Sequence, residues 1–465
     1  MNTLAAVMER IDRIAVFLLA FLYTAWQLTQ WEPLSLAVGG MGFIVIALLL
    51  RHLKGMTLWL TVFFLAGGAL FMLWQQADAP YWLEAASLNV TLVTLFVFAP
   101  LFGIPVRLPE YARALERFYE TNVRSKTAMF AGTQTLTQIM GAFINVGSIP
   151  VVYHIAFVKP QAGFSRMLAD AINRGFGGAI FWSPYFAAMA LVTSALSLRW
   201  STLLPYLPVL AGLNILASLL VDAKGLRRAE RTVLEREGTD GGTEAASERS
   251  EKGSKAGFPT GLAFYLVAAI LIIVLMERWI ELPMVLITCA AAAVFPLIWC
   301  AAKKEMPTFR QGLKNHITVT LPALRKEMTL FLAAGFFSGA VGATGFGVYI
   351  PSLLESFPLP VALTFSIFTV LLIAGTSIAG LHPIVPVAIL ANGIDPASMQ
   401  ITPVYFALLL LGSWGLSNTI SPVSAVNNLL AGLTKLPVFE LAKANYKFAA
   451  CMGGLLLLYL SLLRF

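Results

Sequence analysis

Apolar residues form long runs separated by short polar stretches, and most runs have the length of a membrane helix. An α-helix that crosses a bilayer needs about 20 apolar residues. The uninterrupted runs that fit are 14–30, 34–50, 57–75, 86–105, 203–221, 258–276, 283–301 and 446–463, with a Gly-rich run at 328–350. The first run lacks the small-residue cleavage site of a signal peptide, so we interpret it as a mature membrane helix.

Four further apolar runs are interrupted by glycine, proline and small polar residues. They are 127–158, interrupted at 145–150; 170–198, interrupted at 175–178 and 183–184; 361–391, interrupted at 376–377 and 382–383; and 402–434, interrupted at 417–422. Proline and clustered small polar residues end or kink a helix. We therefore predict broken helices in 170–198 and 402–434, and hairpins that dip into the membrane and return in 127–158 and 361–391.

Three segments are too polar to cross a bilayer. Residues 107–126 carry charges of both signs, with Leu108, Tyr111, Leu115 and Phe118 at helical spacing, which predicts an amphipathic helix lying on the membrane. Residues 303–327 form a basic amphipathic piece. Residues 222–257 are rich in charge, Gly and Ser, which predicts a mostly disordered cytoplasmic linker.

The composition supports a membrane protein. Hydrophobic residues make up 58% of the chain and charged residues 12%, and the mean hydropathy is +0.78. A globular chain has about 25% charged residues, so soluble classes fit poorly. Cys289, Cys300 and Cys451 lie in apolar runs and form neither a disulfide framework nor a metal-ligand pattern.

The position of the charges predicts the topology. With a cytoplasmic N-terminus and eleven crossings, every Lys and Arg falls on the cytoplasmic side except Arg199, Arg278 and Arg464. Short cytoplasmic loops of membrane proteins are rich in Lys and Arg, so this bias explains the net charge of +8 without a nucleic-acid partner. We expect a multi-pass protein of the cytoplasmic (inner) membrane.

The two halves of the chain repeat one plan. A first helix in 1–33 precedes two units, 34–221 and 258–465, joined by the linker 222–257. Each unit has plain helices, a hairpin, a broken helix and a final helix. Because each unit has an odd number of crossings, the second would be inverted relative to the first, as in many secondary transporters.

At these breaks the chain resembles the ion transporter superfamily, and most closely its divalent anion/sodium symporter architecture. The residues that carry the resemblance are Asn145-Val146-Gly147-Ser148-Ile149-Pro150, Thr376 to Pro383, Ser417-Asn418-Thr419 and Ser421 to Asn427. The resemblance implies an all-α membrane fold with eleven helices and two opposed re-entrant hairpins. It also implies a homodimer formed through the plain helices.

Polar side chains at the breaks are the candidates for a binding site. Non-helical backbone within a membrane is tolerated only where it is buried in protein or lines a wet cavity, and transporters bind substrate there. The predicted substrate ligands are Asn145, Gly147, Ser148, Ser183, Thr376, Ser377, Ser417, Asn418, Thr419, Ser421 and Asn427, of which Asn145, Ser148, Asn418 and Thr419 are also candidates for Na⁺.

Some of these signals have a simpler interpretation. A single proline or glycine in a membrane helix often marks only a kink. The small residues of 335–347 favour close helix packing over ligand contact. His154 and His382 are either satisfied core residues or contacts for substrate or a coupled proton.

Charged residues are absent from the middle of every predicted span. An anion would then be bound by helix dipoles and neutral donors alone. The sequence also lacks the spacing of a catalytic nucleophile and base, a metal-ligand cluster and a phosphate-binding loop. We therefore expect no enzyme and no cofactor, but a secondary transporter of a small anion, a carboxylate for preference, coupled to Na⁺ or H⁺. The alternative is a cation/proton antiporter on the same scaffold.

Overall fold

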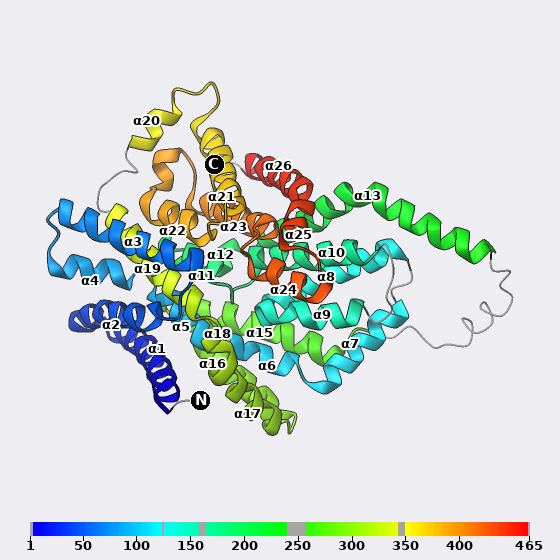
Figure 1. Ribbon diagram of the computed structural model, residues 1–465, viewed down its shortest axis with the longest axis horizontal. Coiled ribbons are helices and arrows are strands. Elements are labelled where there is room, and N and C mark those ends of the chain that lie inside the picture. Colours follow the sequence, from blue (N-terminus) through cyan, green and yellow to red (C-terminus); the bar gives the residue numbers. More distant parts are fainter. Residues whose placement is uncertain (1–2, 123–124, 158–163, 240–256, 343–348, 464–465) are drawn as a thin grey trace.

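The protein is an all-α integral membrane protein. The computed structural model describes residues 3–122, 125–157, 164–239, 257–342 and 349–463, and all regular structure in these ranges is helical (Figure 1). Twelve helical segments of the described chain are long and apolar enough to cross a membrane. Ten of them contain predicted crossings, and two, Lys126–Ala156 and Val361–Ile378, belong to the predicted hairpins. The predicted crossing 328–350 is not among them; its helix ends at Gly342, and residues 343–348 lie outside the described chain.

The first half of the chain begins with the extra N-terminal helix. Its helices are α1 (Thr3–Thr29), α2 (Glu32–Leu50), α3 (Gly55–Trp74), α4 (Ala79–Ser87), α5 (Val90–Phe98), η1 (Ala99–Phe102), α6 (Gly103–Val106), α7 (Pro109–Asn122), α8 (Lys126–Ile144), η2 (Asn145–Gly147), α9 (Ser148–Ala156), α10 (Ser165–Trp182), α11 (Ala187–Ala195), α12 (Trp200–Leu203) and α13 (Leu207–Thr239).

The second half runs through a similar order of elements. Its helices are α15 (Thr260–Trp279), α16 (Met284–Ala302), α17 (Met306–Asn315), η3 (His316–Thr320), α18 (Leu321–Ala323), α19 (Arg325–Gly342), α20 (Ile350–Leu354), α21 (Val361–Ile378), α22 (Ile384–Gly393), η5 (Pro396–Met399), α23 (Pro403–Ile420), α24 (Ala425–Thr434), α25 (Val438–Ala444) and α26 (Tyr446–Leu462). The inverted relation of the two halves stays a prediction.

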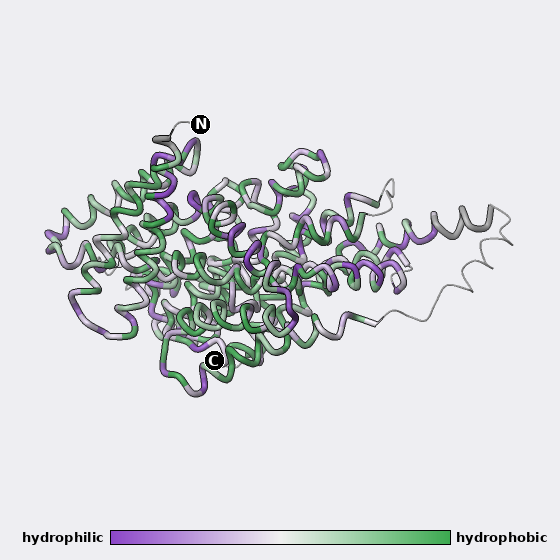
Figure 2. The backbone as a smooth tube through the Cα atoms, turned by 90° about the horizontal axis from the view of Figure 1, so that it is seen from below, coloured by the Kyte–Doolittle hydropathy of each residue, from purple (hydrophilic) through white to green (hydrophobic). Residues whose placement is uncertain are grey.

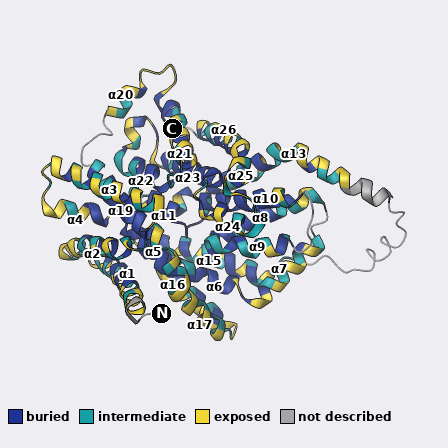
Figure 3. Ribbon diagram, in the orientation of Figure 1, coloured by how far each residue is buried: buried dark blue, intermediate teal, exposed yellow. Residues whose placement is uncertain are grey.

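Helices at the edge of the bundle present apolar faces outward. Trp59, Phe63, Leu70 and Leu73 of α3 are exposed, and so are Phe264, Val267, Leu271 and Leu275 of α15. Large contiguous apolar surfaces of this kind mark contact with lipid or another protein. In the centre, α10, α11 and α23 are almost entirely buried (Figure 3). Apolar residues dominate the bundle, whereas the part of α13 that leaves the bundle is polar (Figure 2).

The chain folds back on itself between α8 and α10. These helices pack in the same direction, because Phe130 packs with Leu168 near their beginnings and the Ser183 hydroxyl donates to the Ala142 carbonyl near their ends. The intervening α9 must therefore return the chain to the starting level, as the hairpin prediction requires.

A second fold-back lies between α21 and α23. The rings of Phe365 and Phe406 lie 5.6 Å apart near the beginnings of these helices. Beyond their ends, a Cβ added at Gly380 would lie 3.7 Å from Val423. The two helices are again parallel, and α22 returns the chain. Whether both hairpins are re-entrant in a bilayer remains a prediction.

The two broken helices, α10 and α23, cross in opposite directions at the centre of the molecule. A Cβ added at Gly177 would lie 2.8 Å from the Gly415 carbonyl oxygen, and one at Gly415 would lie 2.6 Å from that of Gly177. The backbones touch there, which no larger residue would permit. Gly177 was predicted to interrupt its helix, but α10 is continuous through 175–178 and ends only at Trp182.

Two other predicted interruptions are also displaced. Thr376 and Ser377 lie in the last turn of α21, and the chain turns only at 379–383. Ser417, Asn418 and Thr419 continue α23, whose break covers 421–424. By contrast, α8 ends at Ile144 and the turn begins at Asn145, as predicted.

The predicted disorder of 222–257 is wrong for its first part. Helix α13 continues without interruption from the apolar segment to Thr239. Ala, Leu, Arg and Glu dominate this stretch, and these residues have high helix propensity. Residues 240–256 lie outside the described chain.

Candidate functional site

The tip of the first hairpin is built by Asn145 and the two serines near it. Asn145 has φ 49° and ψ −136°, a strained conformation for a residue with a side chain. Its Oδ1 accepts the N–H of Val146 at 2.7 Å, and its carbonyl accepts the Ser148 hydroxyl at 2.8 Å. The Ser183 hydroxyl donates to the Ala142 carbonyl at 2.6 Å. These contacts satisfy groups that the broken helix leaves free and fix the shape of the tip.

A guanidinium group lies directly against this tip. A Cβ added at Gly147 would lie 2.3 Å from Nη2 of Arg107, so the guanidinium occupies the space that a side chain there would take. Arg107 is exposed, and within the described chain no hydrogen-bond or ion-pair partner is found for it. A charged donor therefore lies beside a hairpin tip at which the sequence analysis considered neutral donors alone.

Arg107 reaches the tip because the fourth span breaks before it. In this span α5 gives way to η1 and α6, with Pro100 and Pro105 in the sequence. The Val97 carbonyl at this break accepts Nε2–H of His316 at 2.8 Å, and the Phe102 carbonyl accepts the Tyr265 hydroxyl at 2.8 Å. Both donors come from the second half of the chain. A Cβ added at Gly103 would lie 2.5 Å from Ile144, which places α6 against the end of α8.

Helix α7 packs against the base of the same hairpin. The Tyr119 hydroxyl donates to the Met129 carbonyl at 3.2 Å. Burial raises the pKa of Tyr119 to about 12, so this phenol stays neutral and remains a donor. Tyr111 and Leu115, predicted on the apolar face of the amphipathic helix, are buried.

The later break forms a separate polar group around two asparagines. Nδ2 of Asn427 donates to the carbonyls of Thr419 at 3.0 Å and Ser421 at 2.9 Å. Nδ2 of Asn173, on α10, donates to the Thr419 carbonyl at 3.0 Å and to Oδ1 of Asn427 at 2.9 Å. The chain thus supplies its own donors to these carbonyls. Asn173 is a member of this group that the sequence analysis missed.

Other polar atoms near this break are buried without a hydrogen-bond partner in the described chain. They are Oγ of Ser377, Nδ2 of Asn418 and Oγ of Ser421. Buried polar groups are nearly always paired with protein, water or ligand, so these three point to a bound group. The neighbouring hydroxyls of Thr376, Ser417 and Thr419 instead donate to carbonyls of their own helices.

The predicted site residues thus divide into two groups. Asn145, Gly147, Ser148 and Ser183 lie at one end of the α10–α23 crossing, and Ser421 and Asn427 lie near Asn173 at the other. No hydrogen bond between described residues joins the two groups directly. Of the Na⁺ candidates, Asn145 and Ser148 lie beside the Arg107 cation, which disfavours a second cation there.

The two histidines occupy different surroundings. His382 lies between the rings of Phe331 and Trp414, at 5.4 and 6.0 Å, and its Nδ1 accepts the N–H of Ile384 at 3.2 Å. His154 is exposed and contacts Tyr153 at 5.9 Å between ring centroids. A role in binding substrate or a proton stays a prediction for both.

A buried network of charged residues lies on α10. The sequence predicts charged residues only at the end of this span. Arg174 is 1% exposed and forms an ion pair with Asp222 of α13. Its Nε donates to Oδ1 of Asn445 at 2.7 Å, and Asn445 donates to Asp170 at 3.3 Å. The network joins α10, α13 and the beginning of α26. Helix α10 begins at Ser165, so Asp170 and Arg174 lie inside the bundle.

No protein-family model matches the chain, and no curated protein sequence matches it. Among solved structures, the chain is similar to the YdaH transporter of Alcanivorax borkumensis, which is described as having an unusual topology. The match has 15% sequence identity and a TM-score of 0.42, and it covers 87% of this chain and 98% of that one. A similarity at these values does not show what this chain does.

Arg107 is the main residue that the sequence analysis missed. Its signal is the sequence Pro100-Leu-Phe-Gly-Ile-Pro105 that precedes it in an apolar run. Two prolines five residues apart end a regular helix, and a basic residue directly after a broken span is a candidate ligand for an anion.

Proposed function

We propose that the protein is a secondary active transporter that moves a small anion, a carboxylate for preference, by alternating access. The proposal rests chiefly on the position of Arg107, whose guanidinium lies unpaired against the tip of the first hairpin. Because Arg107 has no partner among the described residues, its guanidinium donors are available to a ligand.

The chemistry of this tip favours a carboxylate. The planar guanidinium offers two parallel N–H donors that match the two oxygens of a carboxylate. Helix α9 begins at Ser148, and its N-terminus adds partial positive charge beside Arg107. Gly147 has no side chain, which leaves room for the guanidinium at the turn.

The second group supplies neutral donors and acceptors. The unpaired amide of Asn418 and the hydroxyls of Ser377 and Ser421 suit a second part of the substrate or a coupling ion. Na⁺ and H⁺ are both candidates for the coupling ion. The two groups lie at opposite ends of a crossing of two broken helices, where alternating exposure to the two sides is expected in transporters of this kind.

One observation favours the alternative, a cation/proton antiporter. Asp170 is 7% exposed, and its only partner among the described hydrogen bonds is Asn445 at 3.3 Å. A buried carboxylate of this kind is a common proton carrier in membrane transport. An antiporter would need Asp170 and would not need Arg107.

Screening followed by transport distinguishes these functions. Thermal-shift measurements of the purified protein against mono-, di- and tricarboxylates, phosphate and sulfate, with and without Na⁺, should identify a stabilising anion. Uptake of that anion into proteoliposomes should then depend on an imposed Na⁺ or H⁺ gradient. We expect Asn145→Ala and Asn418→Ala to weaken transport by about ten- to hundredfold, since a hydrogen bond to a charged group contributes about 1.5–3 kcal/mol.

Ser461→Ala in the exposed end of α26 is the control, because its hydroxyl bonds only to the Leu458 carbonyl. The opposite result is exchange of a cation for H⁺ in a way that requires Asp170 and is unaffected by any anion. That result would contradict the proposal and show that the protein is an antiporter. Unchanged affinity and rate in both folded site variants would show that the proposed binding site is wrong.

A further inference from the structure

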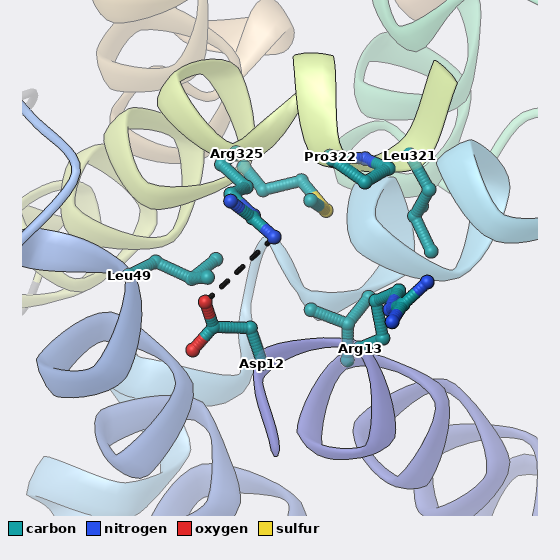
Figure 4. Close-up of a pocket in the computed structure, with 8 residues that line it drawn as sticks. Asp12, Arg13, Leu49, Leu321, Pro322 and Arg325 are labelled. Carbon is teal, nitrogen blue, oxygen red and sulfur yellow. Dashed lines mark ion pairs between the residues drawn. The ribbon is translucent and has the colours of Figure 1, made fainter. Parts of the chain in front are cut away.

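We propose that a pocket between α1, α2 and the α18–α19 junction binds the phosphate of an acidic phospholipid. The pocket is remote in sequence from the hairpin tips and is lined by Asp12 and Arg13 of α1, Leu49 of α2, and Leu321, Pro322 and Arg325 of the second half (Figure 4). Val16 and Met328 complete its apolar wall.

The charge around the pocket is positive despite its buried carboxylate. Asp12 is 1% exposed and is already paired with Arg51, and its Oδ2 lies 2.7 Å from Nε2 of His52. Arg325 lies 3.8 Å from the same carboxylate, beyond hydrogen-bond distance. The Asp12 carboxylate therefore faces Arg51, His52 and Arg325. Arg13 adds a further positive charge at the pocket.

Two of these basic groups have capacity for a ligand. Nη2 of Arg325 is buried and has no hydrogen-bond partner in the described chain, although its side chain reaches toward Asp12 (Figure 4). Arg13 lies across the pocket, and its only described hydrogen bond runs from Nε to the Glu9 carbonyl at 3.3 Å. Guanidinium groups with free donors recognise phosphate oxygens well.

The surroundings favour a lipid over a free phosphate. On α1, Ile14, Leu18 and Phe21 form an exposed apolar stripe at helical spacing, next to Arg13. Val319, two residues before Leu321 of the pocket wall, is exposed as well. Acyl chains can lie along these residues while the headgroup phosphate meets the arginines at the mouth of the pocket.

The predicted topology places this pocket where acidic lipids are found. The N-terminus, the loop 51–54 and Arg325 all fall on the predicted cytoplasmic side. Basic pockets between membrane helices on that side commonly bind acidic headgroups. The proposal concerns lipid binding alone and does not depend on which substrate is transported.

Native mass spectrometry of the purified full chain can test this binding. The protein is titrated with phosphatidylglycerol and, separately, with phosphatidylcholine of the same acyl chains. We expect phosphatidylglycerol to bind at least fivefold more tightly and Arg13→Gln to remove most of that preference. Arg10→Gln, on a neighbouring exposed position of α1, is the matched control and should keep it.

A third arm uses inorganic phosphate as competitor. Displacement of phosphatidylglycerol only at phosphate concentrations far above that of the lipid supports the lipid as ligand, whereas stoichiometric binding of free phosphate would overturn it. Equal retention of the two lipids, or an Arg13→Gln protein with the preference intact, would also overturn the proposal. Arg13 has no ion pair within the described chain, so its replacement should leave the fold intact.

Discussion

Gly147 shows how one missing side chain can shape a binding site. The guanidinium of Arg107 occupies the place of its absent Cβ. We predict that Gly147→Ala displaces the end of the flexible Arg107 side chain, leaves the fold intact and weakens binding of the anion about tenfold or more.

Isothermal titration with the anion found by screening is the measurement for this substitution. Gly40→Ala in α2 is the matched control, because a Cβ there meets nothing within 4 Å. Equal affinity for the anion in the Gly147→Ala and Gly40→Ala proteins would show that Arg107 does not bind the anion.

His316 illustrates how a single buried group ties stability to pH. Its Nε2 donates to the Val97 carbonyl, while its Nδ1 is buried with no hydrogen-bond partner among the described residues, so a proton added there meets no acceptor among them. Burial lowers the pKa of His316 below its ordinary value, and the backbone hydrogen bond opposes this only in part. The fold therefore favours neutral His316.

The sign of the pH effect follows from that lowered pKa. An unfolded histidine takes up its proton below about pH 6.5, so the stability that neutral His316 contributes is complete above that value and is lost as the pH falls. We predict that the melting temperature of the natural protein falls more between pH 7.5 and 5 than that of His316→Gln, whose amide can still donate to Val97. Parallel melting curves across this range would contradict the prediction.

At the scale of single elements, the broken helices are stabilised by side chains of other elements. Asn427 is buried, donates to the carbonyls of Thr419 and Ser421, and accepts a side-chain N–H of Asn173. We predict that Asn427→Ala lowers the free energy of unfolding by about 1–3 kcal/mol, since it removes these buried hydrogen bonds and takes one acceptor away from the buried Asn173 amide.

Denaturant unfolding in detergent measures this difference. The neighbouring Asn428 is exposed and donates to the carbonyl of its own helix at 2.9 Å, so Asn428→Ala should change stability by less than about 0.5 kcal/mol. A larger loss for Asn428→Ala than for Asn427→Ala would show that the break is not stabilised as described.

The positions of the breaks explain what the sequence could and could not predict. A residue before proline disfavours helical backbone, so α10 ends at Trp182 before Ser183-Pro184 and α23 ends at Ile420 before Ser421-Pro422. The prolines predicted that these breaks exist, but not at which residues the helices end. Ser417 to Thr419 continue α23, and the glycines of 175–178 permit close packing of α10 instead of ending that helix.

The candidate site was predictable only in part for a similar reason. The polar residues of the first hairpin could be recognised from Asn145 to Pro150. For Arg107 the sequence shows only the break at Pro100 to Pro105, because its contact with Gly147 depends on how α6 packs against α8. Asn173 could not be recognised at all, because its position depends on how α10 crosses α23. Such contacts between distant segments leave no periodic signal along the chain.

For the whole molecule, the topology is the prediction with the widest consequences. Position 395, after the second hairpin, should lie outside, whereas the 222–257 segment should lie in the cytoplasm. In a variant that lacks the three native cysteines, single cysteines introduced at 395 and 245 should react with an impermeant reagent from opposite sides. Labelling of both from the same side would overturn the arrangement, including the cytoplasmic N-terminus and the cytoplasmic lipid pocket.

The central claim is that Arg107 binds the transported anion at the tip of the first hairpin. The most direct measurement is the affinity of the purified protein for that anion in Arg107→Gln, Arg107→Lys and Arg113→Gln. Arg113 lies exposed on the adjoining α7 and donates to the Pro109 carbonyl, so it controls for the loss of one positive charge. We predict a loss of about ten- to hundredfold for Arg107→Gln, a smaller loss for Arg107→Lys, and none for Arg113→Gln. Natural affinity in a folded Arg107→Gln protein would contradict the claim.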